Sequence, residues 1–207
     1  PIGVDLNHVV ESLKEALEAV GYTPHVIHVT ELMQEVLPEL VTDNSSYANR
    51  YNSLIKNADA VRRKADQHAA LAGMAISDIR RRRTKLVPTK EGVPVEPALG
   101  NAFIVRQFKR AEEIQLMRQV YGRKFIQVSI YLDKDDRESL LIKKIKSYNS
   151  QTVSDAVARK HAIDLIEKDF KESQDEYGQR VSDVFHLGDI FVKGDGSEVA
   201  SETIRRF

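Results

Sequence analysis

The chain has 207 residues, with 31 Lys and Arg against 31 Asp and Glu, so its formal net charge is zero. This length suits one domain or two small ones, and 42% hydrophobic residues are enough for a packed core. Zero net charge argues against a protein that coats nucleic acid along its length. The absence of Cys excludes disulfides, thiolate catalysis and zinc sites with Cys ligands. Without an apolar run of membrane-spanning length or a signal peptide, we expect a soluble, cytoplasmic α/β protein.

Hydrophobic spacing predicts helices that alternate with short strands. The first half gives a helix over 6–20, a strand over 25–29, a helix over 31–40, a polar loop over 43–51 and a long helical stretch over 54–83 that is interrupted near Gly73. The second half gives a loop over 87–100, a strand over 102–106, a helix over 110–121 closed by Gly122, the strongest strand over 124–132, helices over 134–145 and 155–171, a strand region over 184–185 and 189–192, and a short helix over 197–206. This alternation favours a parallel sheet with right-handed crossovers and helices on both faces.

Charge is distributed unevenly along the chain. From Arg50 to Lys90 there are 11 Lys or Arg against 3 Asp or Glu, so this block carries +8 and the remainder carries −8. Arg80 to Arg83 are consecutive within it, and Tyr47 and Tyr51 lie close by in the sequence. A basic helical block of this kind either binds RNA, DNA or an acidic partner, or is a solvated helix face balanced by acidic residues elsewhere.

The segment 1–6 places a glycine turn directly ahead of the first predicted helix. Such a turn directs backbone N–H groups and the positive end of the helix dipole toward an anion, and phosphate suits both. Gly3 matches the last glycine of a Walker A loop, but Val4 stands where that loop has Lys and Asp5 where it has Ser or Thr. Asp5 is therefore either a metal ligand or the N-cap of the helix. The alternative is a plain capped helix after a turn.

Two charged segments follow predicted strands. Arg106, Lys109 and Arg110 come after the strand 102–105, at the end where open α/β sheets bind ligands, and can hold an anion or serve as surface charges. In the segment 133–137, clustered carboxylates either hold Mg²⁺ or, more commonly, cap the helix that starts after Asp133, and Arg137 is a separate candidate for phosphate. The six His show no metal-ligand spacing and no Ser-His-Asp arrangement is suggested, so we assign no catalytic residue and no metal ligand.

Two long segments resemble a known family. Residues 103–125 (FIVRQFKRAEEIQLMRQVYGRKF) and 175–192 (DEYGQRVSDVFHLGDIFV) are similar to the N-terminal, P-loop nucleotide-kinase-like domain of the bacterial deoxycytidylate deaminases that act in anti-phage defence. The resemblance covers essentially the whole chain. It implies one degenerate kinase-like domain over 1–207, a three-layer sandwich with a mostly parallel sheet and a helical, basic insertion at about 44–100. It also places the family's first strand ahead of Pro1 and a zinc deaminase domain after Phe207.

The resemblance implies a nucleotide-binding, regulatory domain of an enzyme that converts dCMP or dCTP to the uracil form and so depletes a phage's DNA precursors. Zinc belongs to the downstream domain, because its His-x-Glu and Pro-Cys-x-x-Cys motifs do not occur in this chain. The expected ligand of this chain is a nucleotide, with Mg²⁺ as its counterion. The predicted nucleotide-binding or phosphate-binding residues are Gly3, Asp5, Arg106, Lys109, Arg110 and Arg137.

The departure from kinases at Val4 leaves two other functions open. An active nucleoside monophosphate kinase would need another cation in place of the Walker lysine and would use Arg159, Lys160 and Lys168 as lid residues. An RNA-binding or protein-binding module would act through the basic block, and regulation by a small RNA is a theme of the family. The expected partners are a nucleotide, a small RNA, the protein's own deaminase domain and further copies of the chain, and no membrane. The phosphate hypothesis requires that the Gly3 turn and the corner after Val105 face a shared cleft.

Overall fold

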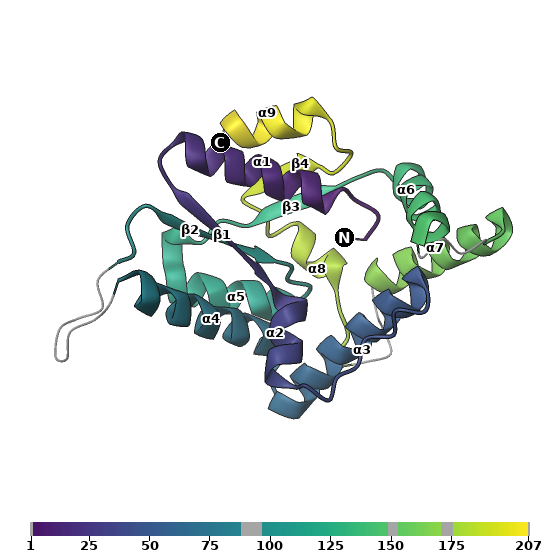
Figure 1. Ribbon diagram of the computed structural model, residues 1–207, viewed down its shortest axis with the longest axis horizontal. Coiled ribbons are helices and arrows are strands. Elements are labelled where there is room, and N and C mark those ends of the chain that lie inside the picture. The colour runs from purple at the N-terminus through teal and green to yellow at the C-terminus, as the bar shows by residue number, and fades with distance from the viewer. Residues whose placement is uncertain (1, 88–96, 149–152, 171–175, 207) are drawn as a thin grey trace.

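The structure is a computed structural model, and it describes residues 2–87, 97–148, 153–170 and 176–206. Within these ranges short strands are surrounded by helices, which gives an α/β fold (Figure 1). The strands are β1 (Thr23–His28), β2 (Asn101–Arg106), β3 (Val128–Tyr131) and β4 (Ile190–Lys193). The helices are α1 (Leu6–Ala19), α2 (Val29–Val36), α3 (Tyr47–Ala65), α4 (Ala70–Leu86), α5 (Ala111–Tyr121), the 3₁₀ helix η1 (Gly122–Lys124), α6 (Lys134–Ser147), α7 (Asp155–Phe170), α8 (Val181–Phe185) and α9 (Glu198–Arg206).

The strands form two small parallel sheets. β1 pairs with β2, with Ile27 opposite Val105, and β3 pairs with β4, with Ile130 opposite Val192. Helices lie on both sides of the strands: α1 and α9 on one side, and α4, α5 and α8 on the other (Figure 1). The predictions of an α/β fold, parallel strands and flanking helices are therefore confirmed. In the described residues the strands do not join into one larger sheet.

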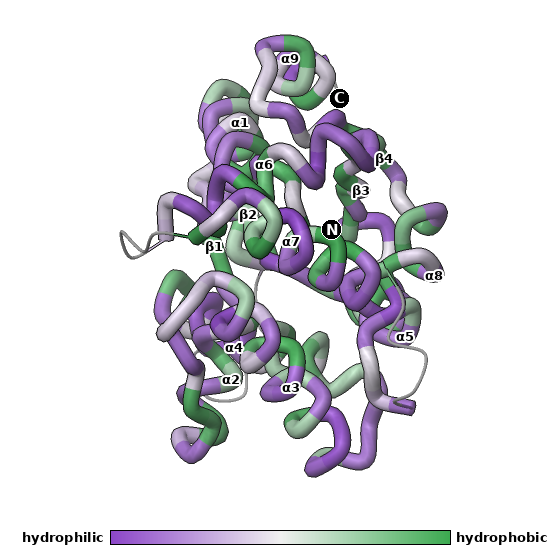
Figure 2. Tube along the Cα trace, turned by 90° about the vertical axis from the view of Figure 1, so that its right-hand side faces the viewer, coloured by the Kyte–Doolittle hydropathy of each residue, from purple (hydrophilic) through white to green (hydrophobic). Residues whose placement is uncertain are grey.

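Each sheet has its own apolar contacts with helices. Ile27 of β1 packs with Ile79 of α4 and Met117 of α5, whereas Ile130 and Val192 of the β3–β4 sheet pack against α1 and α9. In Figure 2 the hydrophobic segments gather where helices face strands, and the outer turns are mostly hydrophilic. Burial of these aliphatic side chains is the main favourable contribution to the fold.

Helices α1 and α9 are also joined by polar contacts. The hydroxyl groups of Ser12 and Ser201 lie 2.8 Å apart in a buried hydrogen bond, and His8 Nε2 is 3.0 Å from Ser201 Oγ. Val9 and Ile204 belong to the apolar cluster that the two helices share. The two ends of the described chain are thus packed against each other.

A buried charged network, formed by Arg62, Glu113 and Arg110, connects α3 with the start of α5. Glu113 Oε1 accepts hydrogen bonds from Arg62 Nε at 3.1 Å and Nη2 at 2.8 Å. Glu113 Oε2 accepts from the backbone N–H groups of Lys109 at 2.7 Å and Arg110 at 3.0 Å. The Arg110 guanidinium donates to the carbonyl oxygens of Glu176 and Gly178, each at 2.7 Å. The network therefore holds the backbone at the corner between β2 and α5 in place through buried hydrogen bonds.

Two predictions about the central helices are wrong. The segment 43–51 is not a loop throughout, because α3 begins at Tyr47 after Ser46, whose Oγ accepts a hydrogen bond from Asn49 N at 3.1 Å. The long helical stretch breaks at Asp66, which adopts a left-handed conformation with φ of 50°, while Gly73 lies inside α4. Ser is a strong N-cap, and Asp tolerates the left-handed region. The start of α3 and the break after it are therefore set by single polar residues, Ser46 and Asp66, and not by a glycine.

Two predictions about the C-terminal half also need correction. The strand predicted over 124–132 contains only Val128–Tyr131, because η1 occupies its start and Gln127 N–H donates to Asp189 Oδ2 at 2.7 Å. Residues 184–185 belong to α8 rather than to a strand. Residues 88–96 of the predicted loop lie outside the described residues. None of the described helices combines the length and apolar character needed to cross a membrane.

Candidate anion-binding site

The turn ahead of α1 lies where β2 and β3 end. Arg137 in the first turn of α6, just after β3, donates from Nε to the Ile2 carbonyl oxygen at 2.9 Å. Gly3 has φ of +77°, and a Cβ added there would lie 2.9 Å from the Arg137 carbonyl oxygen. Glycine is therefore required by conformation and by space. The Asp5 side chain accepts from His8 N at 3.1 Å, so the structure assigns Asp5 to the N-cap of α1.

A buried carboxylate stands at the centre of this corner. Asp169, in the last turn of α7, is 2% exposed, and its Oδ2 accepts a hydrogen bond from Ile2 N–H at 2.7 Å. Its Oδ1 pairs with Lys109 Nζ, and Oδ2 is 3.5 Å from Arg137 Nη2. Burial by itself raises the pKa of this carboxyl, but the positive charges of Lys109 and of the amino terminus, with the hydrogen bonds from Lys109 and the Ile2 N–H, outweigh it and lower the pKa to about 2. Asp169 is therefore an anion held by two cations and a backbone donor.

One donor of Arg137 makes an ion pair but no hydrogen bond within the described residues. Burial lowers the pKa of its guanidinium, and the nearby Asp169 acts in the opposite direction. Its Nη2 atom is buried and makes no hydrogen bond within the described ranges. Within the described residues this atom has the 3.5 Å ion pair with Asp169 Oδ2 but no acceptor at hydrogen-bond geometry, so a ligand oxygen closer to it would satisfy the donor better.

Arg106, the last residue of β2, brings a third cation to the turn. Its Nη1 donates to Asn7 Oδ1 in the first turn of α1 at 3.0 Å. Burial lowers the pKa of this guanidinium, and the charges of Tyr51 and Glu31 act in the opposite direction. In the part of the chain that the structure describes, Arg106 has no carboxylate within ion-pair distance. The turn and the corner after Val105 thus lie next to each other, and the shared cleft that the phosphate hypothesis requires stays a prediction.

The remaining predicted residues are placed elsewhere. Arg110 is 1% exposed and is engaged with Glu112 and the segment 176–178, so it supports the corner rather than facing a ligand. Of the predicted lid residues, Arg159 is exposed and pairs with Glu138 at 3.4 Å, and Lys160 is exposed. Lys168 lines a hollow of about 260 Å³ between α3 and α7, where its Nζ is 3.5 Å from Asn52 Oδ1.

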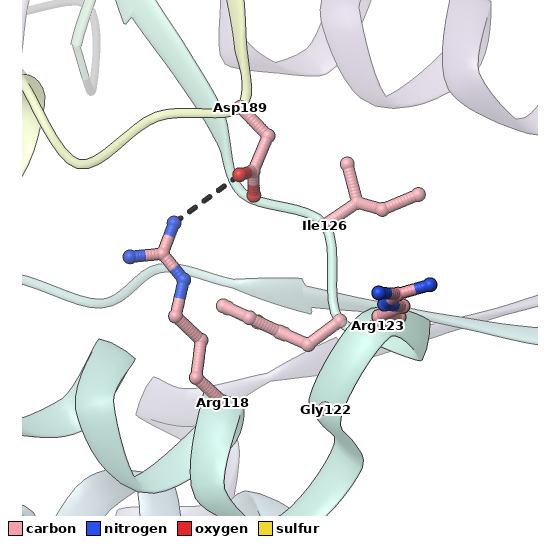
Figure 3. A pocket seen from close by; sticks show the side chains of 6 residues that line it. Arg118, Gly122, Arg123, Ile126 and Asp189 are labelled. Carbon is pink, nitrogen blue, oxygen red and sulfur yellow. Dashed lines mark hydrogen bonds and ion pairs between the residues drawn. The ribbon is translucent and has the colours of Figure 1, made fainter.

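A larger hollow lies at the opposite ends of the strands. It has a volume of about 570 Å³ and is open, and Figure 3 shows Arg118 paired with Asp189 across it at 3.3 Å. Its lining residues precede β3 and β4, whereas the Gly3 turn lies after β2 and β3. Ligands of open α/β sheets bind at the carboxyl ends of the strands, so the Gly3 corner is the better candidate although neither of the two hollows lies there.

The basic block is partly neutralised within the fold. The buried carboxylate of Asp78 accepts from Arg81 Nε at 3.1 Å and from Arg82 Nε at 2.7 Å. These two charges therefore balance a buried anion in the same helix. This arrangement favours the interpretation of the segment as a solvated helix face.

Asp169 and Lys144 were not predicted from the sequence. Asp169 follows Leu165 by four residues and Ile166 by three, so this spacing places it on the apolar face of α7. A carboxylate at such a position is the sequence feature that could have identified it as a buried, paired group. The structure buries Asp169 on that face and leaves Phe170, the next residue, exposed. Lys144 Nζ donates to the Val4 carbonyl oxygen at 3.2 Å, and nothing in its surface-like sequence context indicated this.

No protein-family model, curated protein or solved structure matches this chain. Among the described residues, no three His, Asp or Glu side chains are grouped in a way that would hold a metal ion.

Proposed function

We propose that this protein binds the phosphate groups of a nucleotide at the Gly3 turn, with Arg106, Lys109 and Arg137 as the cationic contacts. The observation that carries the proposal is an excess of positive charge. Three partly buried cations surround the turn, from the end of β2, from the loop after it and from α6, and Asp169 is the carboxylate paired with two of them. Partly buried cations strongly favour an anionic ligand, and guanidinium groups match phosphate geometry.

We propose further that the chain is a degenerate P-loop nucleotide-kinase-like sandwich. Parallel strands, helices on both sides and a glycine turn that opens α1 beside the ends of β2 and β3 support this arrangement. In such folds a helix N-terminus after a glycine turn is the phosphate site. The domain organisation, with an insertion at about 44–100, is part of the same proposal.

The role that we propose is binding rather than phosphoryl transfer. The Val4 side chain is buried against Ile130 of β3, and a Cβ added at Gly194 would lie 2.8 Å from Val4 Cβ. Position 4 therefore points into the core instead of toward a β- or γ-phosphate, and no Walker lysine is present to neutralise those charges. A coupled assay with ATP and nucleoside monophosphates is expected to show no transfer, and measurable transfer would favour the kinase alternative.

The sequence resemblance suggests which nucleotides to test first. In a domain that controls a deoxycytidylate deaminase in the cytoplasm, dCTP and dCMP are the informative ligands, with ATP as a comparison. Mg²⁺ would enter with the nucleotide, because Asp5 is used as a helix cap and the described residues offer no carboxylate cluster for it. Zinc would belong to the deaminase domain.

The direct test is calorimetric titration of dCTP, with and without Mg²⁺, into the wild-type protein and Arg106→Met. We expect binding to the wild type and an affinity about 10- to 100-fold lower for Arg106→Met, because one charge-assisted hydrogen bond contributes about 1.5–3 kcal/mol. Arg106→Met is informative because this side chain makes no ion pair within the described residues and its loss should leave the fold intact.

The matched control is Arg159→Met, which removes an exposed arginine from α7 without touching the corner. We expect its dCTP affinity to stay within about twofold of the wild type, since exposed pairs contribute little. Arg118→Met tests the larger hollow in the same way. Absence of binding by the wild type, or an affinity loss confined to Arg118→Met, would overturn the proposed site.

A further inference from the structure

The Asp169 carboxylate occupies the position that an anionic ligand would take in the proposed site. It bonds to the Ile2 N–H, which belongs to the turn ahead of α1, and to Lys109, one of the proposed phosphate contacts. Its Oδ2 also faces Arg137 Nη2 at 3.5 Å, the donor that lacks a hydrogen bond in the described residues. One internal carboxylate thus engages three donors that converge from different elements.

Asp169 does not neutralise all of the positive charge around it. Lys109 and Arg137 together carry two positive charges, and Asp169 supplies one negative charge. A terminal phosphate group, which approaches two negative charges at neutral pH, would balance both cations and has more acceptor oxygens than a carboxylate. The donor set therefore favours a phosphate over the carboxylate that now occupies it.

The position of Asp169 in α7 allows it to leave without unfolding the helix. It lies in the last turn, one residue before the described end of α7 at Phe170, which is itself exposed. Beyond the site contacts, this turn is held from outside the helix by a hydrogen bond from Gln179 Nε2 to the Lys168 carbonyl oxygen at 3.3 Å, by the contact of Lys168 Nζ with Asn52 Oδ1 at 3.5 Å, and at its start by the packing of Ile166 in the core. Terminal helical turns open at low free-energy cost compared with a helix centre.

We propose that Asp169 is an internal competitor that closes the phosphate site, and that ligand phosphate displaces it and releases the last turn of α7. This proposal rests on the proposed function, because it regulates the same site. Binding would then be coupled to a local order change at α7, which gives the domain a means of reporting an occupied site.

The test compares tripolyphosphate binding, measured calorimetrically without metal at constant ionic strength, for the wild type, Asp169→Asn and Asp164→Asn. Asn keeps the shape of Asp169 and removes the competing charge, so we expect Asp169→Asn to bind at least tenfold more tightly. Asp164→Asn removes a carboxylate from the exposed face of the same helix and should match the wild type. Equal or weaker binding by Asp169→Asn, with the wild type still binding, overturns the competitor role and leaves the proposed function standing.

A second measurement uses the wild type alone, in case Asp169→Asn does not fold. Saturating tripolyphosphate should accelerate hydrogen–deuterium exchange at residues 166–170 and leave residues 156–160 unchanged. Unchanged or slower exchange at 166–170 in the bound protein contradicts displacement. If neither the wild type nor Asp169→Asn binds tripolyphosphate, the proposed function itself fails together with its regulation.

Discussion

Replacing Glu113 by Ala is expected to lower the free energy of unfolding by about 3–5 kcal/mol, because it breaks a buried ion pair and leaves buried donors of Arg62, Lys109 and Arg110 without their acceptor. Glu113 is fully buried and accepts hydrogen bonds from the Arg62 guanidinium and from the backbone N–H groups of Lys109 and Arg110. Without it, Arg62 keeps its 3.1 Å contact with Asp59 but loses its second carboxylate. Urea denaturation followed by circular dichroism measures the change.

The control for this prediction is Glu112→Ala, one residue earlier on α5. Glu112 also pairs with an arginine, Arg110, at 3.1 Å, but its side chain is 39% exposed. A partly exposed pair of this kind contributes about 0–1 kcal/mol. Equal decreases in the free energy of unfolding for the two variants would show that the buried Glu113 network stabilises the fold no more than an exposed ion pair does.

Acidification is expected to remove about 2 kcal/mol of stability through Asp169 alone. Its pKa is about 2 in the folded protein, against an ordinary value of 3.8. Because the folded pKa is lower, the stabilisation is fully present above about pH 4 and is lost as the pH falls toward 2. The physical source is the positive charge around the carboxylate, above all that of Lys109, together with the hydrogen bonds from Lys109 and the Ile2 N–H, which exist only in the folded state.

The measurement is the difference in unfolding free energy between the wild type and Asp169→Asn from pH 2 to pH 6. Taking a difference cancels carboxyl groups common to both, including Asp195, whose pKa is also about 2. The wild-type advantage should shrink below pH 4. A difference that stays constant over this range would mean that Asp169 is not held as an anion in the folded state.

The periodic elements were predictable because their signals are local. The helix predicted over 6–20 is α1 (Leu6–Ala19), and that predicted over 110–121 is α5 (Ala111–Tyr121), with Gly122 as its C-cap. Both have a clear apolar face and a glycine at or near the end. The strand over 124–132 failed because its apolar run does not show where ladder pairing starts, which a non-local contact between Gln127 and Asp189 decides.

The site was only partly predictable for the same reason. Strand ends bring Arg106, Lys109 and Arg137 to one corner, and sequence order alone indicates that. Arg110 looks equivalent to Lys109 in sequence, but the backbone directs it toward Glu176 and Gly178. The approach of Asp169 to Lys109 spans 60 positions, and no local pattern encodes such a pairing.

The contact between α1 and α9 has a mechanical consequence. Ser12, Ser201 and His8 form polar links across the two helices, and Val9 and Ile204 share one apolar cluster. A small rotation of α1 must either carry α9 along as a lever or break these contacts. Since the turn that opens α1 contributes the Ile2 N–H to the anion site, a movement of this turn on ligand binding would reach α9 directly through the helix-to-helix interface.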